Sequence, residues 1–444
     1  MQHSKDCYHP ADIFGQEARY ELFLGSGFEL QKKITEYSYK KRTFDLEAQH
    51  SSTRITEVSP EFCLALAIAW LPSGAFAEHQ TLLIKKLCGE VRSWDAVLVL
   101  VDRHRIPALA YTNLLGSASI VPARIMAALK QRSQKARHQA LAHTAEISRL
   151  HQILTQQGIA CLPLKGSILS ILLYGDPGVR QANDIDILIK AKEFERAEKL
   201  LLAEGYQRQS PPFALPPDSG KLMNSLIHHF EYHHPQRKIM LELHWRGNFY
   251  RSQSNKYFWE YNTKTNIAGQ EYTVLNEDFQ LLYLCTHGAY HKYFRIKWLG
   301  DIAKIISENR ISSWERVIEI ARELQVLSSL ALSVLLINQL FLLPIPDALS
   351  KLAKQETVQD LVPEVIEAIL GKEEEVSGGI KNIVFQKRLN PSVSIATILK
   401  TMLVCRDDLK LVHFPGQLFW LYIPLRPAFW IWRHYLATEN SKKK

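Results

Sequence analysis

The run from Asn183 to Ile189 constrains this chain most, because it sets two carboxylates among β-branched and apolar side chains. Such a run predicts a buried strand, and side chains along a strand alternate between its two faces. Asp184 and Asp186 are therefore expected to point to the same side. Two like charges on a mostly apolar strand repel each other and lose hydration, so they require a compensating partner. A divalent cation with phosphate oxygens is the first hypothesis.

The composition and charge of the chain are those of a folded globular protein. Its 444 residues, 46% of them hydrophobic and 22% charged, are enough for two or three domains with hydrophobic cores. The net charge of +9 favours anionic partners, yet no dense basic run or alternation of basic and aromatic residues predicts a nucleic-acid groove. The six cysteines lack the close pairing of zinc and redox motifs, and no secretory signal pattern is found. We therefore expect reduced thiols and a cytoplasmic location.

Two apolar stretches, 62–77 and 414–432, are the longest candidates for a membrane span. Proline, together with glycine or arginine, interrupts each of them, so neither offers about 20 uninterrupted apolar residues and we expect no transmembrane segment. The second stretch is rich in aromatic residues and precedes a basic tail, Lys442-Lys443-Lys444. Peripheral contact with a membrane surface is one interpretation of this stretch, and closure of a hydrophobic core is the favoured one.

Apolar periodicity divides the chain into four regions and predicts an α+β fold. Residues 1–58 form a poorly defined N-terminal extension, and residues 59–158 form a helical region that begins at Ser59-Pro60. Residues 159–274 form a core with a small mixed β-sheet, and residues 275–444 form a C-terminal helical region. The helices predicted in the two helical regions cover 94–104, 123–137, 141–157, 279–291, 297–307, 314–324 and 328–341.

The core is predicted from a change of period after Gly158. A short apolar run over 159–164 indicates a strand, which is followed by the turn Lys165-Gly166-Ser167 and a helix over 168–174. The elements predicted after the aspartate strand are a helix over 194–204, a proline-rich loop over 210–218, and a hairpin with strands over 227–232 and 238–245.

Glu242 lies in the second strand of that hairpin with apolar residues on either side, as Asp184 and Asp186 do in theirs. If the two strands pair, three carboxylates converge on one spot. Three carboxylates suit one or two Mg²⁺ ions, or Mn²⁺, and one of them can act as a general base. The alternatives are a solvated edge strand for the aspartates and an ordinary surface position for the glutamate.

Lys165-Gly166-Ser167 lies where a strand turns into a helix, which aims free backbone amides at an anion. Gly166 permits close approach of the backbone, and Ser167 adds a hydroxyl donor. Arg180, four residues before Asp184, fits either a contact with a phosphate or an ion pair with an aspartate that anchors the loop.

Taken together, these motifs resemble the nucleotidyltransferases of the DNA polymerase beta superfold, and specifically an uncharacterised bacterial branch with a Leu-Lys-Gly turn. The corresponding parts here are Leu164-Lys165-Gly166, the loop Tyr174-Gly175-Asp176-Pro177-Gly178-Val179-Arg180, and Asp184-Ile185-Asp186. The third acid of the superfold carries over onto Glu242. The resemblance covers roughly residues 59–435. The sequence departs from the superfold in having Lys165 before the glycine of the turn and a glutamate as the third acid.

The resemblance implies a magnesium-dependent enzyme that transfers a nucleoside monophosphate from an NTP, with ATP the expected donor. The acceptor would be a hydroxyl or a phosphate of an unknown molecule, such as a small molecule or peptide of a biosynthetic pathway. The roles it implies are catalysis and metal binding for Asp184, Asp186 and Glu242, nucleotide binding for Lys165, Gly166, Ser167 and Arg180, and acceptor or cleft positions for His287, Arg295, Lys297 and Asp301.

Other functions stay open at this point. A glycosyltransferase would use the Asp-x-Asp pair to hold manganese and a sugar nucleotide, and would need a nucleotide-binding α/β domain before the motif. A nucleotide-binding protein would have kept the fold and lost catalysis. His287 and His291 lie one helical turn apart, a spacing that can bind zinc, but no third ligand is evident near them.

Overall fold

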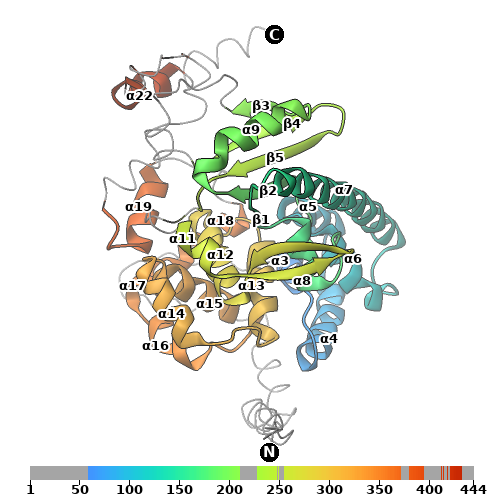
Figure 1. Cartoon of the computed structure of the whole chain (residues 1–444). Coiled ribbons are helices and arrows are strands. Elements are labelled where there is room, and N and C mark those ends of the chain that lie inside the picture. The colour runs from blue at the N-terminus through green and yellow to red at the C-terminus, as the bar shows by residue number, and fades with distance from the viewer. Residues whose placement is uncertain are drawn as a thin grey trace, which may run out of the picture. The chain divides into compact units, whose positions relative to one another are not determined.

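The computed structural model describes residues 59–210, 228–247, 249, 255–371, 380–394, 412, 414, 418 and 421–432. The elements within these ranges belong to one compact unit, Pro60–Lys444 (Figure 1). The predicted extension over 1–58, the predicted loop after Ser210 and the lysine tail lie outside the described residues. The boundaries predicted at 158 and 274 stay predictions.

Helices make up the described chain before the sheet, as predicted. Their bounds are α3 Pro60–Ala67, α4 Ala75–Glu90, α5 Trp94–His104, α6 Pro107–Leu114 and α7 Ala123–Gln156. Pro60 begins α3, and the Ser93 side chain caps α5 by accepting a hydrogen bond from the Ala96 backbone N–H.

One of these predictions is wrong, because α7 is a single helix of 34 residues where two were expected. The residues at the predicted break, His138, Gln139 and Ala140, include no glycine or proline. Ala140 is also buried, so the apolar stripe of the helix continues through the break.

The central sheet has five strands in the order β1-β2-β5-β4-β3. Strands β2 and β5 pair in parallel and every other pair in the sheet is antiparallel, which confirms the predicted mixed sheet. Helix α8 joins β1 to β2, and α9 follows β2. The bounds are β1 Cys161–Pro163, α8 Ser167–Tyr174, β2 Asp184–Ile189, α9 Phe194–Ala203, β3 Gln207–Ser210, β4 His229–His234 and β5 Ile239–His244.

The position of the hydrophobic core decides which way the β2 aspartates point. Ile185, Ile187 and Ile189 belong to a core cluster that also contains Leu150 of α7 and Leu201 of α9. Alternate residues of a strand face opposite sides. The aspartates of β2 therefore face away from this core.

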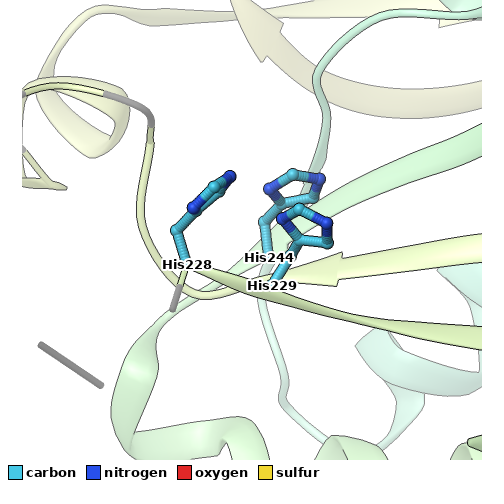
Figure 2. A group of neighbouring side chains, drawn as sticks. All are labelled: His228, His229 and His244. Carbon is cyan, nitrogen blue, oxygen red and sulfur yellow. The ribbon is translucent and has the colours of Figure 1, made fainter. Parts of the chain in front are cut away.

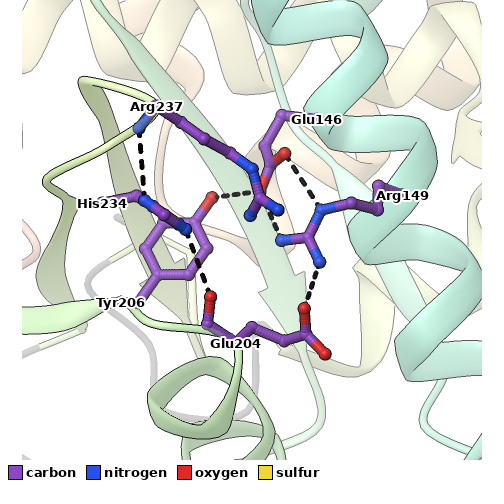
Figure 3. Close-up of polar contacts among 6 residues, drawn as sticks. All are labelled: Glu146, Arg149, Glu204, Tyr206, His234 and Arg237. Carbon is purple, nitrogen blue, oxygen red and sulfur yellow. Dashed lines mark hydrogen bonds and ion pairs between the residues drawn. The ribbon is translucent and has the colours of Figure 1, made fainter.

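A polar cluster around the buried Glu146 joins α7 to the end of α9 and to the turn between β4 and β5 (Figure 3). Glu146 Oε1 accepts hydrogen bonds from Arg149 at 2.6 Å and from Tyr206 at 2.7 Å, and lies 3.3 Å from Arg237 Nη1. Arg149 also pairs with Glu204. We call this set the Glu146 cluster, and its members are Glu146, Arg149, Glu204, Tyr206, His234 and Arg237.

After the sheet the chain continues with a two-stranded antiparallel sheet and a second set of helices, so the predicted α+β fold is confirmed. The β6–β7 hairpin was not predicted. Its turn, Ala268-Gly269, has φ of 51° and 83° and so resembles the tight turns of two-residue hairpins. The bounds are α11 Asn255–Glu260, β6 Asn262–Ile267, β7 Gln270–Leu275, α12 Glu277–Tyr290, α13 Lys297–Ser307, α14 Trp314–Glu323, α15 Leu327–Phe341, α16 Ser350–Ala353, α17 Glu356–Gln359, α18 Val362–Leu370, α19 Ile380–Leu389 and α22 Tyr422–Ile431.

Within the described ranges, no helix has both the length and the apolar character needed to cross a bilayer. In the C-terminal aromatic stretch, Tyr422 and Phe429 of α22 are buried and belong to the hydrophobic core cluster. Their burial favours the interpretation that this stretch closes a core.

Candidate functional site

The predicted acidic site is formed by neighbouring strands. In the parallel pairing of β2 with β5, Asp186 lies directly opposite Glu242. Asp186 is buried, with 1% of its surface exposed, and Asp184 is partly buried at the start of β2. The pairing on which the predicted convergence of carboxylates depended is therefore present. We call Asp184, Asp186 and Glu242 the carboxylate centre.

A lysine of the chain itself compensates part of this negative charge. Lys165 Nζ lies 3.1 Å from Asp186 Oδ1, and the lysine side chain is largely buried. Burial alone would lower the pKa of Lys165, but the charges of Asp186, Asp184 and Glu242 outweigh burial and raise it. The lysine is therefore held in its charged form beside the carboxylates.

His244 bridges the two buried acids. Its Nε2 lies 3.2 Å from Asp186 Oδ1 and 3.1 Å from Glu242 Oε2. Despite burial, the Lys165 ammonium and the His244 ring hold the pKa of Asp186 well below its usual range. Burial and the charge of Asp186 instead raise the pKa of Glu242. One strand thus carries a strongly ionised acid and its neighbour carries an acid that retains its proton more readily.

The donor set of the centre fits a divalent cation. One ligand atom each of Asp186, Glu242 and His244 lie within 4.8 Å of one another. Asp186 Oδ2 is buried and has no hydrogen-bond partner among the residues that the structure describes. A buried carboxylate oxygen without a partner is costly, and a metal ion would satisfy it. Asp184 is not in this group of three.

The turn before α8 passes close to the start of β2. Gly166 has φ 75° and ψ −141°, a backbone conformation that residues other than glycine rarely adopt. A Cβ atom added at this glycine would lie 3.6 Å from the backbone oxygen of Asp184. Ser167 begins α8, and its buried Oγ has no hydrogen-bond partner within the described part of the chain. The predicted anion-binding turn thus lies next to the carboxylates.

Arg180 forms the ion pair that was one of its two predicted roles. Its Nε lies 2.7 Å from Asp301 Oδ2, and both side chains are buried. Tyr174 donates a hydrogen bond to Asp301 Oδ1 at 3.3 Å. Lys297 Nζ donates to the Gln181 backbone oxygen at 2.6 Å. Both Asp301 and Lys297 of α13 therefore hold the loop that leads into β2.

The two other residues predicted at the acceptor side have different contacts. His287 of α12 packs edge-on against Trp298, with ring centroids 5.1 Å apart. Burial and the nearby charge of Lys165 lower the pKa of His287, which places this ring within electrostatic reach of the centre. Arg295 donates a hydrogen bond to the Arg103 backbone oxygen at 2.5 Å. An acceptor role for either residue stays a prediction.

Several residues next to the centre were not predicted as site residues. His229 Nε2 lies 3.4 Å from Glu242 Oε2, and His228 packs against His229 and His244 (Figure 2). His143 of α7 is buried near the charges of Asp184 and Asp186. The sequence did contain one signal for His244, because it follows Glu242 by two residues and so shares its face of the strand.

Comparison with protein families assigns the chain to a class. A family model described as an uncharacterised nucleotidyltransferase matches residues 90–342, which is more than half of the chain. The chain belongs to this nucleotidyltransferase family. No curated protein and no solved structure matches it. The predicted enzyme class is thereby confirmed, and a nucleotide substrate follows from it.

The matched residues of this nucleotidyltransferase run from the end of α4 to just past the end of α15. They include the turn, the sheet with its carboxylate centre, and the α12 and α13 helices beside it. The glycosyltransferase alternative required a nucleotide-binding α/β domain before the aspartates. The described residues between Ser59 and β1 are helical, with no strand, and the family match favours nucleotidyl transfer over that alternative.

Proposed function

We propose that this nucleotidyltransferase transfers a nucleoside monophosphate from ATP to a hydroxyl or phosphate of its acceptor in a magnesium-dependent reaction. The observation that carries the proposal is the pairing of Asp186 with Glu242, in which one buried carboxylate oxygen has no hydrogen-bond partner among the described residues. Mn²⁺ prefers the same oxygen ligands and would substitute. A small molecule or peptide of a biosynthetic pathway is the proposed class of acceptor.

In this proposal the carboxylate centre holds the cation, with Asp186 and Glu242 as neighbours in the sheet and Asp184 at the start of β2. A bound Mg²⁺ would bring positive charge to the phosphate oxygens and lower the pKa of an attacking hydroxyl. The carboxylate oxygens of the chain would fix where that charge lies relative to the turn.

The turn residues would hold the triphosphate. Gly166 lets the backbone approach closely, and the Ser167 hydroxyl together with the backbone amides at the start of α8 would donate hydrogen bonds to phosphate oxygens. The Lys165 ammonium can serve a phosphate oxygen as well as Asp186. Arg180 would contribute through the loop before β2, which its pairing with Asp301 holds in place.

The bond changes balance in a single displacement. An acceptor oxygen forms a bond to the α-phosphorus while the bond from the α-phosphorus to the bridging oxygen of pyrophosphate breaks. For a hydroxyl acceptor, the released proton passes to a carboxylate of the centre that does not hold the cation. Glu242, whose pKa burial raises, is the acid that would take this role instead of binding the cation.

The test combines nucleotide binding and turnover. ATP binding is measured by calorimetry with and without Mg²⁺, and pyrophosphate release is measured with a small-molecule extract as the source of acceptor. Asp184→Asn should reduce pyrophosphate release at least about 100-fold, since it removes a carboxylate of the proposed cation site. Asp102→Asn, at an exposed acid of α5 paired with Arg132, is the matched control.

Unchanged pyrophosphate release in Asp184→Asn would overturn the assignment of the carboxylate centre. Tight magnesium-dependent binding of ATP without turnover for any acceptor would instead support the alternative in which the chain binds nucleotide and no longer catalyses.

A further inference from the structure

Three histidines form a cluster at the edge of the carboxylate centre, and the proposed nucleotidyl transfer assigns no role to two of them, His228 and His229. His228 immediately precedes β4, His229 begins that strand, and His244 ends β5. We propose that these three side chains, the histidine cluster, bind a transition-metal dication of the Zn²⁺ class.

The geometry of the cluster brings three nitrogen ligands together. His229 and His244 lie directly opposite each other across the β4–β5 pair, and their ring centroids are 4.5 Å apart. The ring of His228 faces these two rings, with its centroid 4.4 Å from that of His229 and 5.8 Å from that of His244 (Figure 2).

These distances are close to those of a metal site. One ring nitrogen from each histidine lies within 4.8 Å of the others. Nitrogens that bind one tetrahedral Zn²⁺ are about 3.4 Å apart, given metal–nitrogen bonds of about 2.1 Å. Binding would require the side chains to rotate and bring these nitrogens closer together.

A carboxylate already orients two of the rings. His244 Nε2 lies 3.1 Å from Glu242 Oε2, and His229 Nε2 lies 3.4 Å from the same oxygen. An imidazole that donates its Nε2–H to a carboxylate carries its lone pair on Nδ1, and metal-binding histidines are commonly fixed in this way. Glu242 would therefore act as the outer partner that sets the tautomer of His244, and it lies beside His229.

The ligand type separates this site from the carboxylate centre. Imidazole nitrogen suits Zn²⁺ and neighbouring transition metals, whereas Mg²⁺ prefers carboxylate and phosphate oxygens. His229 and His244 are each buried, with 6% of their surface exposed, so water competes little for their nitrogens. The edge of the sheet thus offers a nitrogen site beside an oxygen site, and His244 contacts both.

The experiment uses the full chain, stripped of metal and titrated with Co²⁺ in the presence of a large excess of Mg²⁺. We expect one equivalent of Co²⁺ to bind with the intense visible absorption of four-coordinate cobalt, and Zn²⁺ to displace it. His228→Gln and His229→Gln should each weaken this binding at least about 10-fold. His233→Gln, on the same strand but outside the cluster, is the matched control and should bind Co²⁺ as the unchanged protein does.

Two results would overturn the proposal. One is Co²⁺ binding that excess Mg²⁺ abolishes, which would place the ion in the carboxylate centre. The other is equal Co²⁺ affinity in His228→Gln and the unchanged protein.

A measurement without variants covers the case in which a substitution impairs folding. Zn²⁺ should protect His228, but not His233, from modification by diethyl pyrocarbonate, as read by mass spectrometry. Equal modification with and without Zn²⁺ would contradict the site. Neither measurement depends on nucleotide, so failure here leaves the proposed transferase reaction standing.

Discussion

The Glu146 cluster and the carboxylate centre are each built around a buried acid, but their charges are balanced differently. In the Glu146 cluster, Arg149 and Arg237 lie against Glu146, and Arg149 also pairs with Glu204. Burial works against ionisation of Glu146, yet its hydrogen bonds from Arg149 and Tyr206 lower its pKa overall. Each carboxylate there has an arginine partner.

In the carboxylate centre, Lys165 and the ring of His244 together compensate part of the charge of three acids. The pKa of Asp186 is lowered while the pKa of Glu242 is raised, and the Asp186 Oδ2 atom lacks a partner among the described residues. A cluster that only stabilises the fold has no reason to leave buried carboxylate charge uncompensated. The difference indicates that the centre is built for a further cation and the Glu146 cluster is not.

The largest effect should come from removing Lys165, the lysine that pairs with Asp186. Lys165→Met leaves Asp186 buried without its ion pair, so the free energy of unfolding should fall by about 3 to 5 kcal/mol, measured by urea denaturation. Added Mg²⁺ should restore part of the loss, because it would replace the missing positive charge. Lys130→Met, at an exposed lysine of α7, should change stability by at most about 0.5 kcal/mol. Equal stability of the two variants would contradict the role given to Lys165.

In the Glu146 cluster, a substitution should lower stability and leave nucleotide binding intact. Glu146→Gln removes the shared partner of two arginines, and we expect the free energy of unfolding to fall by about 2 to 3 kcal/mol. The value is below that of a fully buried pair, because Arg149 and Arg237 are partly exposed. Magnesium-dependent binding of ATP, measured below the melting temperature, should be retained. Lost ATP binding at full stability would remove the contrast between the two clusters.

His104 provides a third case. It is a buried titratable group, and no carboxylate is among the groups that shift its pKa. Burial, reinforced by the charges of Arg103 and Arg295, lowers its pKa to about 3. The ring is therefore neutral in the folded protein, and below pH of about 6.5 a proton binds only to the unfolded chain. The folded state therefore keeps its full stability above a pH of about 6.5 and loses stability as the pH falls toward 3.

At pH 5 this linkage should cost about 2 kcal/mol of unfolding free energy relative to pH 7. His104→Asn keeps an acceptor for the Ile296 backbone N–H and should flatten the decline between these two pH values. The check is a series of urea denaturation curves for both proteins. A decline equally steep in the variant would assign the acid sensitivity to other groups.

The smallest change in stability is expected for Glu242→Gln. Because burial and the charge of Asp186 raise the pKa of Glu242, its ionised form at neutral pH destabilises the folded state. The neutral amide should leave the unfolding free energy unchanged or raise it by up to about 1 kcal/mol. Calorimetry with MgATP should show weaker binding in the same variant. A large loss of stability would mean that Glu242 is a structural anchor like Glu146.

The parts of the fold that the sequence predicted are those with a strong local pattern. The aspartate strand, the turn with α8, and the β4–β5 hairpin follow from runs of apolar residues bounded by glycine, proline or polar turns. The β6–β7 hairpin was missed because its strands are mostly polar and exposed on one face. The break predicted within α7 failed because the burial of Ala140 depends on packing.

For the site, the sequence predicted the carboxylates and the turn but not their partners. His244 lies 58 residues from Asp186, and Asp301 lies 121 residues from Arg180. Contacts of this kind depend on the order of strands in the sheet and on where α13 packs. The apolar periodicity of the sequence gives no information on either. For the histidines of the hairpin, only the β4–β5 register shows that two of them lie beside Glu242.

The most direct test compares the two clusters in one calorimetric measurement of MgATP binding. Asp186→Asn and Glu146→Gln each replace a buried carboxylate by its amide, and both are measured below their melting temperatures. We predict that Glu146→Gln binds MgATP as the unchanged protein does, while Asp186→Asn binds at least about 100-fold more weakly. Equal affinity of Asp186→Asn and the unchanged protein would contradict the account of the carboxylate centre as a cation site.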